Sequence, residues 1–265
     1  MDMAGKVAIV TGGGSGIGAA LARRLAADGA VGVVVADIDL ARAQAVAGAI
    51  GPQAVAMACD VSREADIQAL VAATRARFGQ VDAFLSNAGI IGRQGGMELE
   101  DALWNTMWEI HVMAHVWAAR AVMPEMVARG EGAFVVTASA AGLLNIVESA
   151  PYGVTKHAAV GLAEWLRMAY GRQGVKVVCL CPQAVDTEMT RGGAGSAGLN
   201  GVLPPEAVAE EVMQALRAGR FLALPHPEVA DYIQAKASQY DRWLGGMQKL
   251  YAQFKGGSGL GDKAR

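Results

Sequence analysis

Residues 6–10 (KVAIV) form a short run of mostly branched apolar residues that leads directly into a glycine-rich turn, residues 11–18 (TGGGSGIG). A segment rich in Ala, Leu and Arg follows and reaches about Ala27, which is the composition of a helix. Strand, glycine turn and helix in this order present backbone N–H groups and the positive end of a helix to a pyrophosphate. Glycine also lets the backbone approach such a ligand closely. The order therefore predicts a buried strand of a parallel sheet with a dinucleotide site at its end.

An acidic residue ends the next apolar run. Residues 31–36 (VGVVVA) read as a second strand, and Asp37 follows about 20 residues after the glycines. A carboxylate at this distance can accept hydrogen bonds from an adenosine ribose, although a solvated loop charge would give the same sequence. It would also repel a 2′-phosphate, for which NADP sites usually supply Arg or Lys. Ile38 follows Asp37, the glycine turn has no basic residue, and Arg42 is the nearest cation downstream. The sequence therefore favours NAD over NADP.

Tyr152 and Lys156 have the spacing Tyr-x-x-x-Lys, and Ser139 precedes the tyrosine. In a helix this spacing puts the phenol and the ammonium on one face, one turn apart. An ammonium within about 4–6 Å of a phenol favours the phenolate and typically lowers a pKa of ~10 by about 1–3. The phenol can then act as acid and base near neutral pH, while a serine hydroxyl binds a substrate oxygen. Solvated helix faces give the same spacing by chance, so the glycine turn and Asp37 are needed as corroboration.

In combination, these motifs resemble the main branch of the short-chain dehydrogenase/reductase family, from about Lys6 to Thr187. The turn has the family's T-G-x-x-x-G-x-G form, Asn87-Ala88-Gly89 matches its N-A-G motif, and the Ser, Tyr and Lys agree in type and spacing. The resemblance implies cofactor binding by Gly12, Ser15, Gly16, Ile17, Gly18, Asp37, Asp60, Val61, Asn87, Ala88, Gly89, Tyr152, Lys156, Pro182, Val185 and Thr187. It also implies that Ser139, Tyr152 and Lys156 are catalytic, with Lys156 holding the nicotinamide ribose.

Two positions depart from the family pattern. His111 stands where the family usually has an asparagine that anchors a water chain from the lysine to solvent. An imidazole can donate and accept protons near pH 6.5 and so serve such a relay as a catalytic group. Alternatively His111 is a packed helix residue, and Asn105 in a shifted helix is a further, weaker candidate for the polar partner. Gln183 replaces a glycine in the Pro182–Thr187 stretch, which suggests an adjusted turn beneath the nicotinamide.

The rest of the chain alternates strand and helix patterns, which predicts an α/β fold. We expect a single-domain, Rossmann-type, doubly wound parallel sheet of about seven strands with helices on both faces. The catalytic domain is expected over residues 1–255. Further helices are predicted at about 62–78, 99–129, 151–171 and 205–218, and further strands near 54–58, 81–86, 132–138, 175–181 and 220–224.

Three C-terminal features lie beyond the motifs. The glycine-rich segment near 188–203 follows the nicotinamide-side motif, so we expect a mobile substrate loop there, although an ordinary connection has the same composition. Residues 229–254 carry apolar residues at helical spacing and predict one extended helix, which packs on the core, caps the substrate pocket or contacts a neighbouring subunit. Residues 256–265 are expected to form a flexible tail.

Composition excludes several classes of protein. The formal net charge of −2 gives no broad electrostatic case for nucleic acid or anionic membrane, and no apolar stretch is long enough for a membrane span. Three cysteines argue against a disulfide framework and favour a cytoplasmic location. We expect no metal site, because the pair formed by His111 and His115 lacks an acidic or cysteine partner nearby.

These features together predict an NAD-dependent alcohol dehydrogenase or carbonyl reductase. Tyr152 exchanges a proton with the substrate oxygen while a hydride passes to or from the nicotinamide. We expect the substrate pocket to be lined by residues 90–96, 141–150 and 183–184 and by the glycine-rich segment. Leu143, Leu144, Ile146 and Val147 would make it mostly apolar, which favours a small-molecule substrate that is a hydrophobic secondary alcohol or ketone. A non-catalytic NAD-binding regulator on the same fold is the alternative, and a cofactor-free lyase or dehalogenase is a second rival. The resemblance further implies a homotetramer or homodimer.

Overall fold

A parallel sheet of seven strands forms the centre of the molecule, in the order β3-β2-β1-β4-β5-β6-β7. The computed structural model describes residues 1–256, so the expected tail over 256–265 lies almost wholly outside the described residues. The strands are β1 Val7–Thr11, β2 Gly32–Asp37, β3 Ala54–Ala58, β4 Ala83–Ser86, β5 Gly132–Thr137, β6 Val175–Leu180 and β7 Leu222–Ala223. The order reverses between β1 and β4, and ligands of such sheets bind beyond the carboxyl ends of the strands at this point.

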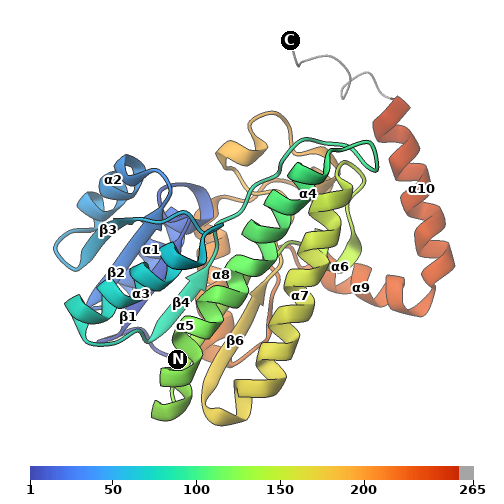
Figure 1. The fold of residues 1–265 in the computed structure, drawn as a ribbon. Helices are drawn as coiled ribbons and strands as arrows, with labels where there is room; N and C mark the ends of the chain where they lie inside the picture. The colour runs from blue at the N-terminus through green and yellow to red at the C-terminus, as the bar shows by residue number, and fades with distance from the viewer. Residues whose placement is uncertain (257–265) are drawn as a thin grey trace.

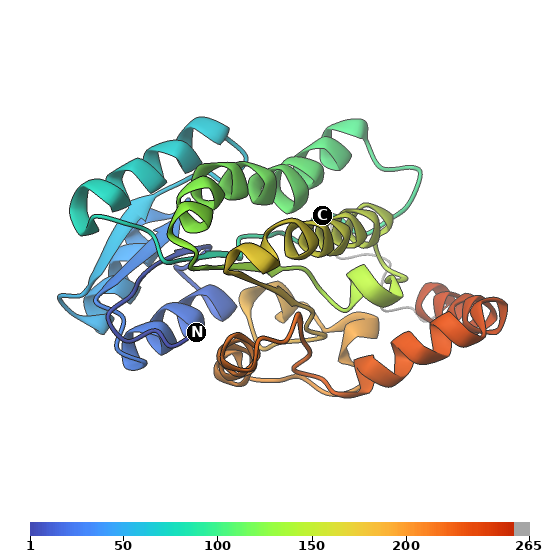
Figure 2. The same ribbon diagram turned by 90° about the horizontal axis from the view of Figure 1, so that it is seen from below.

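Helices cover both faces of the sheet, as Figures 1 and 2 show. The main helices are α1 Gly16–Ala27, α2 Leu40–Ile50, α3 Glu64–Phe78, α4 Asp101–Trp108, α5 Ala114–Arg129, α7 Ala150–Tyr170, α8 Pro205–Ala218, α9 Glu228–Ser238 and α10 Tyr240–Gly256, with a short α6 at Ala141–Leu144. Buried residues of α1, α2 and α8 form one core with the sheet, and those of α3, α5 and α7 form the other. This arrangement confirms the predicted doubly wound α/β fold, and no described helix is both long and apolar enough to cross a membrane.

The buried strands follow from their sequence. All residues of β1, β4 and β5 are buried, as expected for branched and aromatic runs covered by helices on both sides. Asp39 begins α2, because its Oδ1 accepts the backbone N–H groups of Ala41 and Arg42 at 3.0 and 3.2 Å. Ser149 begins α7 in the same way, because its Oγ accepts the N–H of Tyr152.

The long helix predicted over 99–129 contains one turn of π-helix, Glu109–Met113, between α4 and α5. His111 lies in this turn and is fully buried. Single π-helical turns inside α-helices occur frequently at functional sites, because the extra residue changes the direction in which side chains point. The hydrophobic period of the sequence does not show such a turn.

The prediction of one C-terminal helix over 229–254 was wrong. Gln239 has φ −141° and ψ 63°, so the chain turns there and continues as the separate helix α10. Val229, Tyr232 and Ile233 of α9 pack near Leu144, together with Trp243, whereas Tyr240 and Leu244 are exposed at 54% and 46%. In both ribbon views α10 lies at the edge of the molecule, away from the sheet.

Candidate active site

A cavity of about 640 Å³ opens at the carboxyl ends of the central strands. Its walls come from the glycine turn after β1, from the ends of β2 to β6, from α7 and from the segment after β6. Every residue predicted to bind the cofactor lines this cavity, and so does Ser139: Gly12, Ser15, Gly16, Ile17, Gly18, Asp37, Asp60, Val61, Asn87, Ala88, Gly89, Tyr152, Lys156, Pro182, Val185 and Thr187. His111 is the predicted site residue that does not line it.

The glycine turn packs too closely against its neighbours to carry side chains at three positions. A Cβ on Gly12 (φ +64°) would lie 2.9 Å from the Cα of Ala88, and one on Gly16 (φ +48°) would lie 2.9 Å from Cγ2 of Thr187. A Cβ on Gly18 would collide with the carbonyl group of Gly12. The turn runs directly into α1, so its free N–H groups and the positive helix end face the cavity. These features fit a pyrophosphate group.

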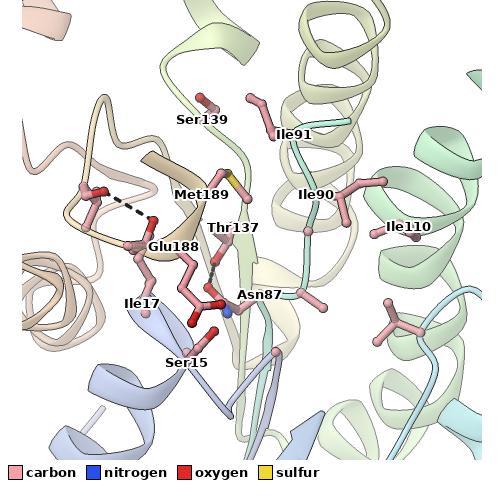
Figure 3. A pocket seen from close by; sticks show the side chains of 18 of the residues that line it. Ser15, Ile17, Asn87, Ile90, Ile91, Ile110, Thr137, Ser139, Glu188 and Met189 are labelled. Atoms are coloured by element: carbon pink, nitrogen blue, oxygen red, sulfur yellow. Dashed lines mark hydrogen bonds between the residues drawn. The ribbon is translucent and has the colours of Figure 1, made fainter. Parts of the chain in front are cut away.

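Asn87 joins the ends of three strands beneath the cavity. Its backbone N–H donates to Oγ1 of Thr11 at 2.9 Å, and its side-chain Nδ2 donates to the Thr11 carbonyl at 3.0 Å. Its Oδ1 accepts the hydroxyl of Thr137 at 3.1 Å, the contact drawn in Figure 3. β1, β4 and β5 are thus held together at their carboxyl ends by one amide side chain.

Asp37 ends β2 at the opposite end of the cavity from Tyr152 along the glycine turn. Its Oδ2 accepts the N–H of Gly14 at 2.9 Å, and its Oδ1 accepts the N–H of Asp39 at 3.0 Å. Both oxygens are therefore oriented by backbone groups while the side chain lines the cavity. Asp60 is fixed similarly, because its Oδ1 accepts the N–H and hydroxyl of Ser62 at 3.0 and 2.7 Å. These carboxylate acceptors fit an adenosine ribose with free hydroxyls better than one that carries a 2′-phosphate.

Ser139, Tyr152 and Lys156 meet at the wall of the cavity. Tyr152 and Lys156 share one face of α7, and the Lys156 ammonium lies 5.6 Å from the centre of the Tyr152 ring. The ammonium donates to the carbonyl of Thr137 at 3.0 Å. Oγ of Ser139 accepts the N–H of Ala141 at 3.1 Å, and the hydroxyl faces the Pro182 carbonyl at 3.4 Å. The solvated helix-face alternative is thereby excluded, since Tyr152 and Lys156 are both buried.

Burial controls the acidity of this group. It raises the pKa of Tyr152, and the hydrogen bond with Ser139 acts in the opposite direction. It also lowers the pKa of Lys156 to about 8. The expected lowering of the phenol pKa by Lys156 is not found in this arrangement, in which burial raises the pKa of Tyr152 and the ammonium donates to the Thr137 carbonyl.

His111 has partners at both ring nitrogens. Its Nε2 accepts the backbone N–H of Ile90 at 3.1 Å, so the ring proton is assigned to Nδ1, which lies 2.9 Å from Oγ1 of Thr155. Its ring also meets that of Tyr152 edge-on at 5.5 Å. Burial, together with the charge of Lys156, lowers the pKa of His111 well below its usual value. The geometry favours the interpretation of His111 as a packed helix residue. Its role in a proton relay from Lys156 to solvent stays a prediction.

His115 was not predicted as a functional residue, and its one sequence signal is its spacing of one helical turn from His111. It is fully buried, with Nδ1 at 2.6 Å from Oγ of Ser86. Its Nε2 has no hydrogen-bond partner among the described residues. Burial, with a contribution from the Lys156 charge, lowers the pKa of His115 to about 3. The His111 ring therefore bonds to the segment after β4 and to α7, whereas the His115 ring bonds to the end of β4.

We expect acid to destabilise the protein through these two histidines. Both are neutral in the folded state, whereas the unfolded chain binds protons below pH 6.5, so stability is lost as pH falls from 6.5. Each buried histidine should remove about 1.5 kcal/mol of unfolding free energy between pH 6.5 and 5. Urea titrations at several pH values measure the slope, and His115→Gln should lose the share of one histidine, about 1.5 kcal/mol over this range. An unchanged slope in that variant would contradict the assignment.

The apolar part of the cavity contains some of the expected residues and lacks others. Ile90, Ile91, Ile110 and Met189 line it, and Figure 3 shows the first three on one side of the pocket. Leu143, Leu144, Ile146 and Val147 do not line it, since Leu144 packs toward α9 instead. Gln183 lines the cavity, and its backbone N–H donates to Nδ1 of the buried His226 at 3.2 Å. Met189 belongs to the segment 188–203 that the sequence analysis expected to be the substrate loop, whereas nothing in the sequence marked Ile110 as a pocket residue.

Known proteins are similar to this chain in sequence and in fold. The family profile described as short chain dehydrogenase matches residues 6–194. A 2,5-dichloro-2,5-cyclohexadiene-1,4-diol dehydrogenase of Sphingobium indicum is 40% identical over 71% of this chain and 76% of its own length. The levodione reductase of Leifsonia aquatica is 35% identical over 69% of this chain and 71% of its own.

Solved structures agree with the sequence relatives. A short-chain dehydrogenase/reductase from Burkholderia phymatum in complex with NAD superposes with a TM-score of 0.82 at 30% identity, over 91% of this chain and 96% of that one. A 3-ketoacyl-(acyl-carrier-protein) reductase from Brucella melitensis, complexed with NADH, gives a TM-score of 0.75 at 30% identity, over 84% and 96% of the two chains. With the profile covering most of the chain and the fold and site in agreement, the chain belongs to the short-chain dehydrogenase/reductase family.

Proposed function

We propose that this protein is an NAD-dependent oxidoreductase that interconverts a hydrophobic secondary alcohol and its ketone. The observation that carries this proposal is the convergence of Ser139, Tyr152 and Lys156 on the cavity built by the glycine turn. NAD is the cofactor, supported by Asp37 at the ribose end and by the related structures that contain NAD or NADH. The name of the Sphingobium relative, a diol dehydrogenase, supports an alcohol as substrate.

NAD, when bound, supplies the two-electron chemistry by accepting or returning a hydride at its nicotinamide ring. The protein supplies binding, orientation and proton transfer. In oxidation, the phenolate oxygen of Tyr152 accepts the proton of the substrate hydroxyl as the C–H bond gives up its hydride. In reduction, the phenol returns that proton to the developing alkoxide.

Ser139 and Lys156 assist this proton transfer. The Ser139 hydroxyl forms a hydrogen bond with the Tyr152 hydroxyl, and it orients the substrate oxygen. Lys156 supplies a positive charge on the same face of α7, and we propose that it also binds the nicotinamide ribose. Residues Pro182, Val185 and Thr187 would contact the nicotinamide side.

A spectrophotometric assay at 340 nm with NAD and a panel of secondary alcohols, including cyclic diols, tests the proposal. Turnover of alcohols and of the matching ketones with NADH is the expected result. Binding of NADH without turnover of any substrate would instead favour the non-catalytic regulator. Preference for polar sugars over apolar ring alcohols would contradict the hydrophobic substrate class, which rests on Ile90, Ile91, Ile110 and Met189.

We also propose that residues 188–203 are the substrate loop. Hydrogen bonds attach the loop to the segment before α7 and to α9. Glu148, just before α7, accepts the Ser196 N–H at 2.5 Å and the Ser196 hydroxyl at 2.8 Å. Asn200 bonds to the Tyr232 hydroxyl of α9 at 3.1 Å. A closed loop would therefore cover the segment between Glu148 and Tyr152 and exclude water from the reacting atoms.

Glu148→Gln is expected to raise the KM for the alcohol about three- to tenfold, with kcat changed less than about twofold. The reason is that loss of one charge-assisted hydrogen bond, worth roughly 1 kcal/mol net, weakens closure without moving Tyr152. Steady-state kinetics at saturating NAD measure the change, with Glu206→Gln, an exposed carboxylate at the start of α8, as matched control. An unchanged KM would count against the loop assignment.

We propose a homotetramer or homodimer and a cytoplasmic location. Trp108, Trp165 and Met168 on α4 and α7 are 44%, 55% and 74% exposed, which is apolar surface suited to a second copy. Light scattering should give two or four times the monomer mass, and a monomer at micromolar concentration would contradict this. The thiols of Cys179 and Cys181 share a hydrogen bond at 3.6 Å and form no disulfide, as expected where thiols are kept reduced. Cell fractionation tests the location.

A further inference from the structure

The ribose end of the cavity holds more charge than Asp37. Arg42, in the first turn of α2, lies beside the glycine turn: a Cβ on Gly14 would meet both the Arg42 Cβ, at 2.8 Å, and Oδ2 of Asp37, at 2.9 Å. The arginine is thus placed next to the carboxylate that faces the ribose. A cation at this place is what a 2′-phosphate requires.

Two carboxylates hold this arginine. Oδ2 of Asp39, the residue that begins α2, lies 3.2 Å from its Nε. Oε2 of Glu188 lies 2.6 Å from its Nη1. Glu188 directly follows Thr187 on the nicotinamide side, and it lines the cavity, so the ion pair joins the two ends of the cofactor site. Figure 3 shows Glu188 pointing from its segment toward the side of the cavity where Ser15 lies.

The local charge therefore disfavours a 2′-phosphate in two ways. Asp37, Asp39 and Glu188 bring three carboxylates to a region where Arg42 is the cation beside the ribose, and a phosphate dianion would be repelled by them. In addition, the guanidinium would have to leave Glu188 before it could form the bidentate contact with phosphate. Both side chains of this ion pair are about half exposed. Its contribution to the ratio of the NADPH and NADH dissociation constants is therefore a factor of about five at most.

We propose that Glu188 is a specificity-determining residue that withholds Arg42 from the 2′-phosphate, so that NAD preference is set by Glu188 together with Asp37. The proposal rests on the proposed use of NAD. It assigns a cofactor-selecting role to the first residue of the substrate loop. The same ion pair also ties that loop to the cofactor half of the molecule.

Fluorescence titration with NADH and NADPH, without any substrate, measures the two dissociation constants directly. In Glu188→Gln the ratio of the NADPH to the NADH dissociation constant should fall about three- to tenfold, because Arg42 becomes free and one repelling charge is removed. In the double variant Glu188→Gln/Arg42→Gln the ratio should return to within about twofold of the wild-type value. Glu131→Gln is the matched control: it removes a carboxylate from an ion pair with Lys6 at the amino ends of β5 and β1, whereas the cavity lies at the carboxyl ends of the strands.

The outcomes separate this proposal from the cofactor assignment. An unchanged ratio in Glu188→Gln, with normal NADH binding and an unchanged Tm, would overturn the role of Glu188 and leave NAD as the cofactor. A fall that persists in the double variant would also overturn it, since the effect of Glu188 would then not depend on Arg42; Arg191, whose Nη1 lies 3.5 Å from Glu188, is the other cation beside that carboxylate. Failure of the wild-type protein to bind NADH would overturn the cofactor assignment and this proposal together.

Discussion

Replacement of Tyr152 by phenylalanine is expected to lower kcat by about 10²- to 10⁴-fold, while NADH still binds. The phenol oxygen is the atom that exchanges a proton with the substrate, and phenylalanine keeps the ring that packs against Met107 and His111. The loss should therefore fall on the chemical step. Steady-state rates at 340 nm and NADH fluorescence titration measure the two effects separately.

A second tyrosine of the same helix serves as the control. Tyr170 ends α7 and packs edge-on against Trp165 at 6.0 Å, outside the cavity. Tyr170→Phe should leave kcat within about twofold of the wild-type value. Full activity in Tyr152→Phe would contradict the proposed mechanism, and equal losses in both variants would show that the effect is structural.

Gly18→Ala is expected to reduce NADH affinity more than tenfold and to lower the free energy of unfolding by about 3 kcal/mol. The added Cβ would collide with the backbone carbonyl of Gly12 and lie 2.8 Å from Nδ2 of Asn87. Neither group can move easily, since one is main chain and the other is bonded to Thr11. The turn would have to open, and its backbone N–H groups would no longer be oriented toward the pyrophosphate.

The matched control is a helical glycine in open space. Gly48 lies on the exposed side of α2, and a Cβ there meets nothing within 4 Å. Gly48→Ala should raise the unfolding free energy by about 0.5–1 kcal/mol, because alanine loses less backbone entropy in a helix. Urea unfolding and NADH titration of both variants test the pair. Normal NADH binding by Gly18→Ala would show that the turn tolerates a side chain.

Features carried by local sequence order were predictable. The apolar run before Thr11, the glycines after it and Asp37 at the end of the next strand follow one another along the chain, and a parallel sheet converts that order directly into a cavity wall. The same holds for Tyr152 and Lys156, whose spacing fixes their common helix face. Residues from all these segments therefore line one cavity, as expected.

Features that depend on tertiary contacts were not predictable. The break at Gln239 has no proline or glycine signal, and the π-helical turn around His111 leaves the hydrophobic pattern unchanged. The direction of the Lys156 ammonium depends on the Thr137 carbonyl of a neighbouring strand. The Arg42–Glu188 pair joins residues 146 positions apart, and no sequence spacing reports such a contact.

The hydrogen bonds of Asn87 divide the site into two parts that can evolve at different rates. The floor consists of strand ends tied through Asn87 to Thr11 and Thr137, so a change at any of these positions disturbs both cofactor binding and the proton-transfer group. The segment after β6, residues 188–203, forms the roof of the site, and it is held by other contacts: Ser196 bonds to Glu148 and Asn200 bonds to Tyr232. Substitutions in the roof can therefore change which alcohol is accepted while the floor keeps the reaction the same.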